Sequence, residues 1–195
     1  MAEHIGTQLI KTERLILRRA LMQDAVDMFQ NWANDPQVTK YLTWPPHKEL
    51  QVTKNIIKQW IQNYDAPDYY QWMIVPKDSN APIGSVSVVR YDSDSDTAEI
   101  GYCIGKKWWN QGFTTEALQA VIRYLFEKAK ISSIEARHDI NNPASGAVMR
   151  KCGMTLQEIA PNTGRNNQGI CDLAVYTIQN RNQSLHTREI GVWKR

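Results

Sequence analysis

The apolar residues of this chain fall at helical spacing in four stretches, residues 22–35, 48–64, 112–130 and 142–153. The third stretch predicts the strongest helix, because its apolar stripe is continuous. That stripe consists of Ala117, Leu118, Val121, Ile122, Leu125 and Ala129. The stripe of the second stretch consists of Val52, Ile56, Ile57, Trp60 and Ile61. The pair Asp35-Pro36 should end the first helix, since a residue before proline avoids the α region.

Seven other stretches are rich in β-branched and aromatic residues and are bounded by turn residues, which predicts strands. They are residues 13–20, 69–76, 82–91, 97–105, 131–139, 154–161 and 170–178. Polar connectors of hairpin type, KDSNA, DSDSD and NTGRNNQG (162–169), join several of them. Residues 38–47 should form an aromatic, proline-rich loop. The order β-α-α-β-β-β-α-β-α-β-β predicts one α+β domain with a mostly antiparallel sheet of about seven strands. Its core is expected over residues 8–180, followed by a tail at 181–195.

Composition narrows the classes of partner. The chain has 195 residues, 22% of them charged, with a formal net charge of +3. No dense basic stripe argues for nucleic acid, whereas an anionic small ligand suits a mildly basic chain. No apolar run reaches the roughly 18 residues of a membrane span, and the N-terminal stretch lacks the apolar region of a signal peptide. The protein is therefore expected in the cytoplasm, with no membrane partner.

The cysteines indicate neither a disulfide framework nor a metal site. They are odd in number and far apart, without the close pairs that zinc sites use. Free thiols in a reducing compartment are the expectation, and no metal is predicted. The three residues are Cys103, Cys152 and Cys171.

The stretch WWNQGFTTEAL (108–118) runs directly into the strongest helix. The first N–H groups of a helix have no partner within it, and phosphate groups bind there. Gly112 lets an anion approach the backbone, the hydroxyl groups of Thr114 and Thr115 add donors, and Lys106 and Lys107 add charge. Neither a P-loop nor a G-x-G-x-x-G motif is present. Taken alone, the segment is equally compatible with a simple loop-to-helix junction.

Two signature regions occur in order, TAEIGYCIGKKWWNQGFTTEAL (97–118) and NNPASGAVMRKCGM (141–154). Together they resemble the GNAT superfamily of N-acetyltransferases, and in particular its branch of ribosomal-protein N-terminal acetyltransferases. The predicted order of elements matches that fold over roughly residues 8–180. The family's Q/R-x-x-G-x-G/A motif corresponds to residues 109–114, with Gly112 in the glycine position. Trp109 and Thr114 depart from it.

The resemblance implies a sheet that is splayed in the middle to hold acetyl-CoA. Backbone N–H groups would bind its pyrophosphate; they belong to Asn110, Gln111, Gly112, Phe113, Thr114 and Thr115. The preceding strand would carry a bulge, and its exposed backbone at Tyr102, Cys103 and Ile104 would line the pantetheine arm. Gly101 and Gly105 within that strand are signals of a bulge or of a close approach.

The resemblance also implies candidate catalytic residues. Glu99 would accept a proton from the amine, directly or through water; a structural partner of a basic residue is the equal alternative. Ser145 in the N-x-x-S sequence would assist the departing thiolate, and no tyrosine between 125 and 175 competes for that role. Asn142 either caps its helix or contacts pantetheine. His138 is a weaker candidate base.

We therefore expect an acetyl-CoA-dependent N-acetyltransferase that acts by direct attack in a ternary complex. The acceptor would be a protein N-terminus or a small-molecule amine. The loop 162–169 holds no carboxylate, which weakens the case for a ribosomal-protein substrate. Tyr41 and Trp44 should border the acceptor. A non-catalytic acyl-CoA-binding module is the alternative, and either a monomer or a homodimer is compatible with the sequence.

Overall fold

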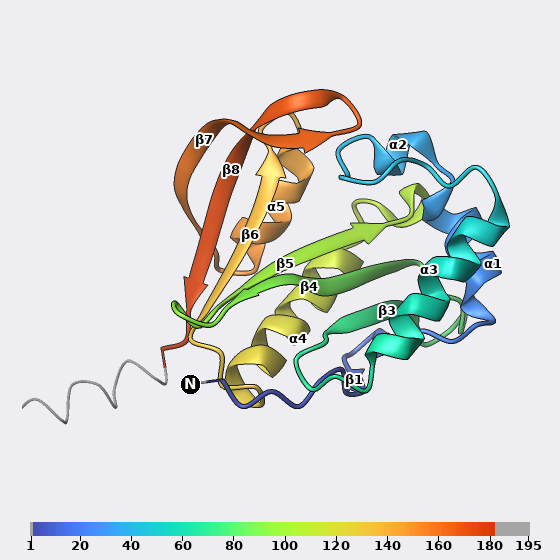
Figure 1. The fold of residues 1–195 in the computed structure, drawn as a ribbon, viewed down its shortest axis with the longest axis horizontal. Helices are drawn as coiled ribbons and strands as arrows, with labels where there is room; N and C mark the ends of the chain where they lie inside the picture. Colours follow the sequence, from blue (N-terminus) through green and yellow to red (C-terminus); the bar gives the residue numbers. More distant parts are fainter. Residues whose placement is uncertain (1, 182–195) are drawn as a thin grey trace, which may run out of the picture.

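The computed structural model describes residues 2–181, so the expected tail at 181–195 lies almost wholly outside the described residues. Eight strands form one open sheet in the order β1-β2-β3-β4-β5-β6-β8-β7 (Figure 1). The strands are β1 (Ile10–Lys11), β2 (Leu15–Arg18), β3 (Gln71–Pro76), β4 (Gly84–Asp92), β5 (Thr97–Ile104), β6 (Ser133–Asp139), β7 (Thr155–Asn166) and β8 (Gly169–Gln179). The mixed α/β class and the mostly antiparallel pairing predicted from the sequence are confirmed.

Helices cover both faces of this sheet. They are α1 (Asp24–Met28), the π-helical turn η1 (Phe29–Ala33), α2 (Pro36–Thr39), α3 (Leu50–Asn63), the short 3₁₀ turn η2 (Lys106–Trp108), α4 (Phe113–Glu127) and α5 (Pro143–Lys151). Side chains of β3 alternate between the two cores, because Trp72 packs with the α4 and α5 face while Met73 packs with the α1 and α3 face. The strand is consequently buried along its whole length.

The sheet divides where β5 meets β6. This is the only parallel pair in the described sheet, and it spans three residue pairs, from Thr97↔Ser133 to Glu99↔Glu135. Beyond Glu99 the two strands separate, as the diverging green and yellow ribbons of Figure 1 show. β6 continues with β8 as its partner, and β5 continues with β4. The splay implied by the resemblance is therefore present, and it leaves one edge of β5 without a neighbouring strand.

Several predicted boundaries were wrong for identifiable reasons. A short strand, β1, precedes the first predicted one and pairs with it through a tight turn at Thr12. The first helix widens into a π-turn closed by Asn34 N–H to Phe29 O, and it ends before the Asp35-Pro36 pair as predicted. On α3, Val52 and Ile61 are exposed, so the buried stripe is narrower than predicted.

The predicted loop 162–169 is mostly strand. β7 runs to Asn166 and β8 starts at Gly169, which leaves a two-residue turn. An irregularity between Ala160 and Gly164 absorbs the extra residues. No helix among residues 2–181 is long and apolar enough to cross a membrane.

Candidate active site

The N-terminus of α4 is prepared to bind an anion. Its first intrahelical bond runs from Glu116 N–H to Gly112 O, so the N–H groups of Phe113, Thr114 and Thr115 precede the ladder. Gly112 has φ +81° and Asn110 has φ +59°, both in the left-handed region. These two residues turn the chain sharply between η2 and α4. The backbone that the resemblance assigned to pyrophosphate thus forms a compact, donor-rich turn.

Arg14, which follows β1, supports this turn and was missed by the sequence analysis. Its guanidinium donates to Gln111 O (3.0 Å) and to Glu116 Oε2 (2.7 Å), and it lies over the Phe113 ring at 4.4 Å. Although burial alone would raise it, the pKa of Glu116 is lowered by hydrogen bonds from Thr12 and Arg14. Nothing in the local pattern around Arg14 indicates this contact, because it spans about half of the chain.

Trp109, one of the two departures from the family motif, fixes the turn from the other side. Its indole Nε1–H donates to Ile104 O (2.9 Å), which ties the turn to the end of β5. The side chain remains 40% exposed. Trp109 therefore has a structural role in this turn, which it fulfils through its indole N–H group.

The free edge of β5 presents alternate backbone groups. Gly105 N–H donates to Ile83 O, on the side of β4. The backbone groups of successive residues in a strand point to alternate sides, so the N–H and C=O groups of Cys103, two residues earlier, also point toward β4, at Ser85. The backbone groups of Tyr102 and Ile104 then point to the side that β6 leaves open. Of the three residues expected to line pantetheine, Cys103 thus has its backbone engaged by β4. Burial raises the pKa of its thiol.

The expected bulge is present but lies on the neighbouring strand. Pairing shifts register between Val88 and Arg90 of β4, opposite Glu99 and Ile100 of β5. A Cβ at Gly101 would lie 2.9 Å from the Val89 side chain, and a Cβ at Gly105 would collide with Asn31 O of η1. Gly101 on β5 and Gly105 directly after it thus mark close approaches, and the bulge itself belongs to β4.

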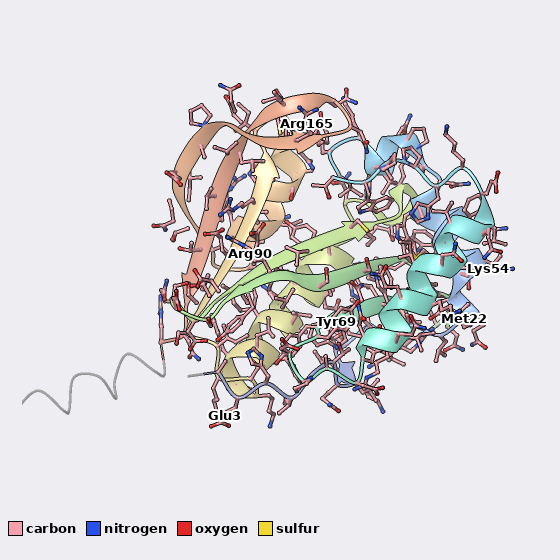
Figure 2. The ribbon with its side chains drawn as sticks, in the orientation of Figure 1. Glu3, Met22, Lys54, Tyr69, Arg90 and Arg165 are labelled. Atoms are coloured by element: carbon pink, nitrogen blue, oxygen red, sulfur yellow. The ribbon has the colours of Figure 1, made fainter. Side chains whose placement is uncertain are left out.

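Glu99 lies at the point of separation, on the sheet face that α3 covers. Its Oε2 contacts Arg90 Nε (3.2 Å) and Arg137 Nε (3.8 Å). Both arginines also contact Glu135 on β6, at 3.9 and 2.7 Å. Figure 2 labels Arg90 beside the diverging strands. Both contacts use Oε2, and Glu99 also lines the cavity described below.

Ser145 lies on the opposite face, in the first turn of α5. Its Oγ is 2.9 Å from the Tyr102 hydroxyl, which also donates to Ser145 O (3.0 Å). Side chains alternate along β5, so Glu99 and Tyr102 point to opposite faces of the sheet. Burial raises the pKa of the Tyr102 phenol well above its usual value. The sequence analysis assigned Tyr102 a backbone role only and missed its side chain.

Asn142 and His138 also lie near the first turn of α5. Asn142 occupies the N-cap position of α5, yet its side chain makes no capping hydrogen bond, so the capping alternative is contradicted. His138 donates from Nδ1–H to Asp139 O (2.8 Å), while its buried Nε2 has no partner among residues 2–181. The ring packs against α5 where Gly146 leaves room for it.

A cavity of about 670 Å³ joins these groups. Glu99, Tyr102, Cys103, Asn142 and Ser145 all line it. Its other walls come from β3, β4, β6 and the β7–β8 hairpin on one side, and from α1, η1, α3 and the 40–49 segment on the other. The second group includes both residues expected at the acceptor, Tyr41 and Trp44. The aromatic side chains in that wall are Trp32, Tyr41, Trp44 and Trp60.

Within residues 2–181, no three His, Cys, Asp or Glu side chains are grouped as metal ligands. The three cysteines are free thiols.

Comparison with known families identifies this arrangement. Residues 14–155 match the family model described as an acetyltransferase (GNAT) domain. The chain belongs to the GNAT acetyltransferase family. The match covers the turn at Gly112, the free edge of β5 and the first turn of α5, so the GNAT resemblance inferred from the motifs is confirmed.

Individual relatives agree. The chain is 26% identical over 174 residues to an uncharacterized N-acetyltransferase, p20, of Bacillus licheniformis, covering 89% of this chain and 97% of the relative. A GNAT-family acetyltransferase structure from Bacillus anthracis superposes with a TM-score of 0.78 at 25% identity, covering 89% and 99% of the two chains. The structure of RimL, a ribosomal L7/L12 α-N-protein acetyltransferase in complex with coenzyme A, has the same fold, with a TM-score of 0.79 at 21% identity over 88% and 98%.

Proposed function

We propose that this GNAT protein transfers the acetyl group of acetyl-CoA to a primary amine within a ternary complex. The observation that carries the proposal is the free edge of β5. It lies between a helix N-terminus suited to phosphate and two candidate catalytic groups on opposite faces of the sheet, Glu99 and Ser145. Solved relatives support the choice of cofactor, since RimL was determined with coenzyme A.

The residues present fit such a ligand. The N–H groups of residues 110–115 would bind the pyrophosphate, with the turn held in shape by Arg14 and Trp109. The outward backbone of Tyr102 and the N–H of Ile104, whose carbonyl accepts from Trp109, would bind the pantetheine arm in the gap left by β6. When bound, acetyl-CoA supplies the acetyl group as a thioester whose carbonyl carbon the amine attacks.

Each catalytic group then has one task. Glu99 would take the proton that the amine loses as its nitrogen bonds to the carbonyl carbon, directly or through one water. The outward N–H groups of β5 would stabilise the oxyanion, because they are fixed before the reaction begins. Ser145 would donate its hydroxyl hydrogen bond to the sulfur as the carbon–sulfur bond breaks. Free thiols at all three cysteines suit the reducing cytoplasm in which we place this reaction.

A two-stage experiment tests the proposal. Acetyl-CoA should first raise the melting temperature of the protein. At a hundredfold excess of acetyl-CoA over its Kd, the free energy of unfolding should increase by about 2.7 kcal/mol. CoA release should then be followed with a panel of amines, using Glu99→Gln, Ser145→Ala and the double variant. Exposed Glu13→Gln and Ser93→Ala serve as matched controls.

We expect each active-site variant to lose about 10²–10⁴-fold in kcat while acetyl-CoA affinity is retained. The controls should behave as the wild type. If acetyl-CoA binds tightly but no amine ever raises CoA release above background, the proposal fails. The protein would then be a non-catalytic acyl-CoA-binding module.

A further inference from the structure

The acceptor side of the cavity is bridged. Asn167, in the two-residue turn between β7 and β8, donates from Nδ2 to Thr39 O and to Trp44 O, both at 2.8 Å. Thr39 is the last residue of α2, and Trp44 lies in the segment between α2 and α3, on the other half of the divided sheet. Figure 1 shows the hairpin extending toward α2 at this end of the molecule, and Figure 2 labels Arg165 on the same hairpin.

Both ends of this bridge are anchored. On the hairpin, Asn166 Nδ2 donates to Asp139 Oδ2 (2.7 Å), and Gln168 N–H donates to Asn166 Oδ1 (2.7 Å). On the other side, the His47 ring lies 5.3 Å from the Trp44 ring, and His47 N–H donates to Ala33 O (2.8 Å). The segment that carries Trp44 is thus fixed over the cavity rather than left open as a groove.

The cavity is partly open, and the bridge across one of its sides limits the size of the acceptor. Its volume of about 670 Å³ must hold the acetyl end of the thioester as well as the acceptor. A protein N-terminus needs a groove along which several successive residues leave the site. The bridge at Asn167 crosses the acceptor side of the cavity, which favours a small molecule.

The charges in the cavity limit the acceptor further. Among the described residues that line it, only Glu99 and Asp139 carry carboxylates. Asp139 already accepts from Asn141 and Asn166, and Glu99 contacts two arginines. No carboxylate is left for a second ammonium group, so polyamines and other polycationic acceptors are poorly matched.

The aromatic side of the cavity indicates which chemical group the rest of the acceptor carries. Half-buried Tyr41, Trp44 and Trp60 line it together with apolar Ile56 and Leu173. Aromatic faces favour flat apolar groups by stacking, and they also tolerate a single ammonium. Building on the proposed acetyl transfer, we propose that the acceptor is a small monoamine on a short chain that ends in an aromatic ring. Its ring packs on the wall of Trp44 and Trp60, and its amine reaches Glu99.

Binding is tested directly on the complex with CoA, in which no transfer takes place. Phenethylamine and tryptamine are titrated calorimetrically and compared with spermidine and with an unmodified hexapeptide. We expect the two aryl amines to bind at least about tenfold more tightly than the others. Turnover with acetyl-CoA should show the same order in kcat/KM.

Two variants examine the wall and the bridge separately. Trp60→Leu and Asn167→Ala should each weaken binding of the aryl amines by about tenfold while the Kd for CoA changes less than about twofold. Gln157→Ala, exposed on β7 away from the bridge, is the control and should bind as the wild type does. Asn167→Ala should also improve use of the hexapeptide relative to the aryl amines.

The outcomes separate the two proposals. Tighter binding and faster acetylation of the hexapeptide or of spermidine would overturn the aryl-amine assignment and leave acetyl transfer intact. If aryl amines bind the CoA complex while no amine of the panel is ever acetylated, the proposed function is overturned and the binding site is kept. Unchanged affinity for the aryl amines in both variants would also overturn the assignment.

Discussion

At the scale of single residues, the hydroxyl groups of Tyr102 and Ser145 form the shortest link between β5 and α5. Tyr102 has one proton and two acceptors within 3.0 Å, both on Ser145. Because burial raises the pKa of Tyr102, the phenol keeps that proton. We therefore assign Tyr102 a positioning role, in which it fixes the orientation of the Ser145 hydroxyl toward the sulfur.

Tyr102→Phe should lower kcat by about tenfold, because one hydrogen bond that orients Ser145 is lost. The KM for acetyl-CoA should stay within about twofold of the wild type, since the backbone of β5 is unchanged. Steady-state kinetics of Tyr102→Phe, Ser145→Ala and the double variant provide the measurement. The double variant should be no slower than Ser145→Ala alone. Additive losses would show that Tyr102 acts independently of Ser145.

Local motifs were enough to place two site residues in the fold, while their roles stay predictions. Gly112 was expected at a loop-to-helix junction and Ser145 in the first turn of a helix, and the structure places both there. Arg14 and the Tyr102 side chain were missed because their partners, Gln111 and Ser145, come from distant parts of the chain. For Glu99 the sequence left a catalytic and a structural role open, and its ion pairs and its place in the lining of the cavity are compatible with both.

At the scale of elements, the turn before α4 depends on backbone conformation. Gly112→Ala would place a Cβ at φ +81°, 3.3 Å from Arg14 Nη2. A left-handed conformation costs a residue other than glycine about 1–2 kcal/mol, so the backbone of the turn should shift. Because its N–H groups would then be displaced, acetyl-CoA should bind about tenfold more weakly. Calorimetric titration with acetyl-CoA measures the effect.

Gly153→Ala is a matched control for that substitution. Gly153 has φ +82°, and its new Cβ would meet only the Ile178 side chain, at 3.6 Å. Both variants should lose similar thermal stability, and only Gly112→Ala should lose acetyl-CoA affinity. Equal loss of affinity in both would mean that the turn has no special part in binding.

The hairpin of β7 and β8 depends on an ionised carboxylate. Burial alone would raise the pKa of Asp139, but hydrogen bonds from Asn141 and Asn166 lower it below its ordinary value of 3.8. A lowered folded-state pKa stabilises the fold above the unfolded pKa, and this contribution is lost as pH falls through the folded value. Asp139 should therefore stabilise the protein at neutral pH and not in strong acid.

Thermal unfolding of Asp139→Asn across the acidic range measures this contribution. The variant should melt below the wild type at pH 7, and the difference should close as pH falls below about 3.8, where wild-type Asp139 takes up its proton. Exposed Asp78→Asn should follow the wild type throughout. A difference that stays constant with pH would assign the effect to side-chain shape instead of charge.

Element prediction was best for the most periodic segment. The stripe of α4 is buried as predicted, from Ala117 to Leu125. The π-turn at Phe29–Ala33 was missed because it covers only five residues. A single wider turn of this length is too short to change the period of the apolar pattern in a recognisable way. The hairpin end was misjudged because Asn, Thr and Gly usually mark loops, whereas here they extend β7 to Asn166.

At the scale of the whole molecule, the divided sheet leaves backbone groups of β5 without a strand partner beyond Glu99. Acetyl-CoA bound in this gap should slow amide hydrogen exchange at residues 100–104 and in the first turn of α4. The central β3 should be unaffected, because it is paired on both sides and buried. Exchange followed by mass spectrometry, with and without acetyl-CoA, provides the measurement. Equal protection of all strands would indicate general stabilisation and no specific occupation of the gap.

The sequence indicated the order of elements and, through the family resemblance, a sheet splayed in the middle. It could not show that β5 and β6 pair over only three residues, because strand length does not report where neighbours separate. The bridge at Asn167 was equally invisible, since it joins residues more than a hundred positions apart.

The bulge in β4 has a consequence for insertions and deletions. Val89 is the additional residue opposite β5, and the residue after it, Arg90, pairs with Glu99. Successive side chains of a strand point to opposite faces, so a β4 shortened by Val89 alone would still place Arg90 beside Glu99, on the face opposite Val88. The ion pairs around Glu99 therefore do not depend on the additional residue. What Val89 contributes is its own side chain, which lies 2.9 Å from the position that a Cβ at Gly101 would take. The strand should thus tolerate the loss of this one residue without turning its charged residues away from the site.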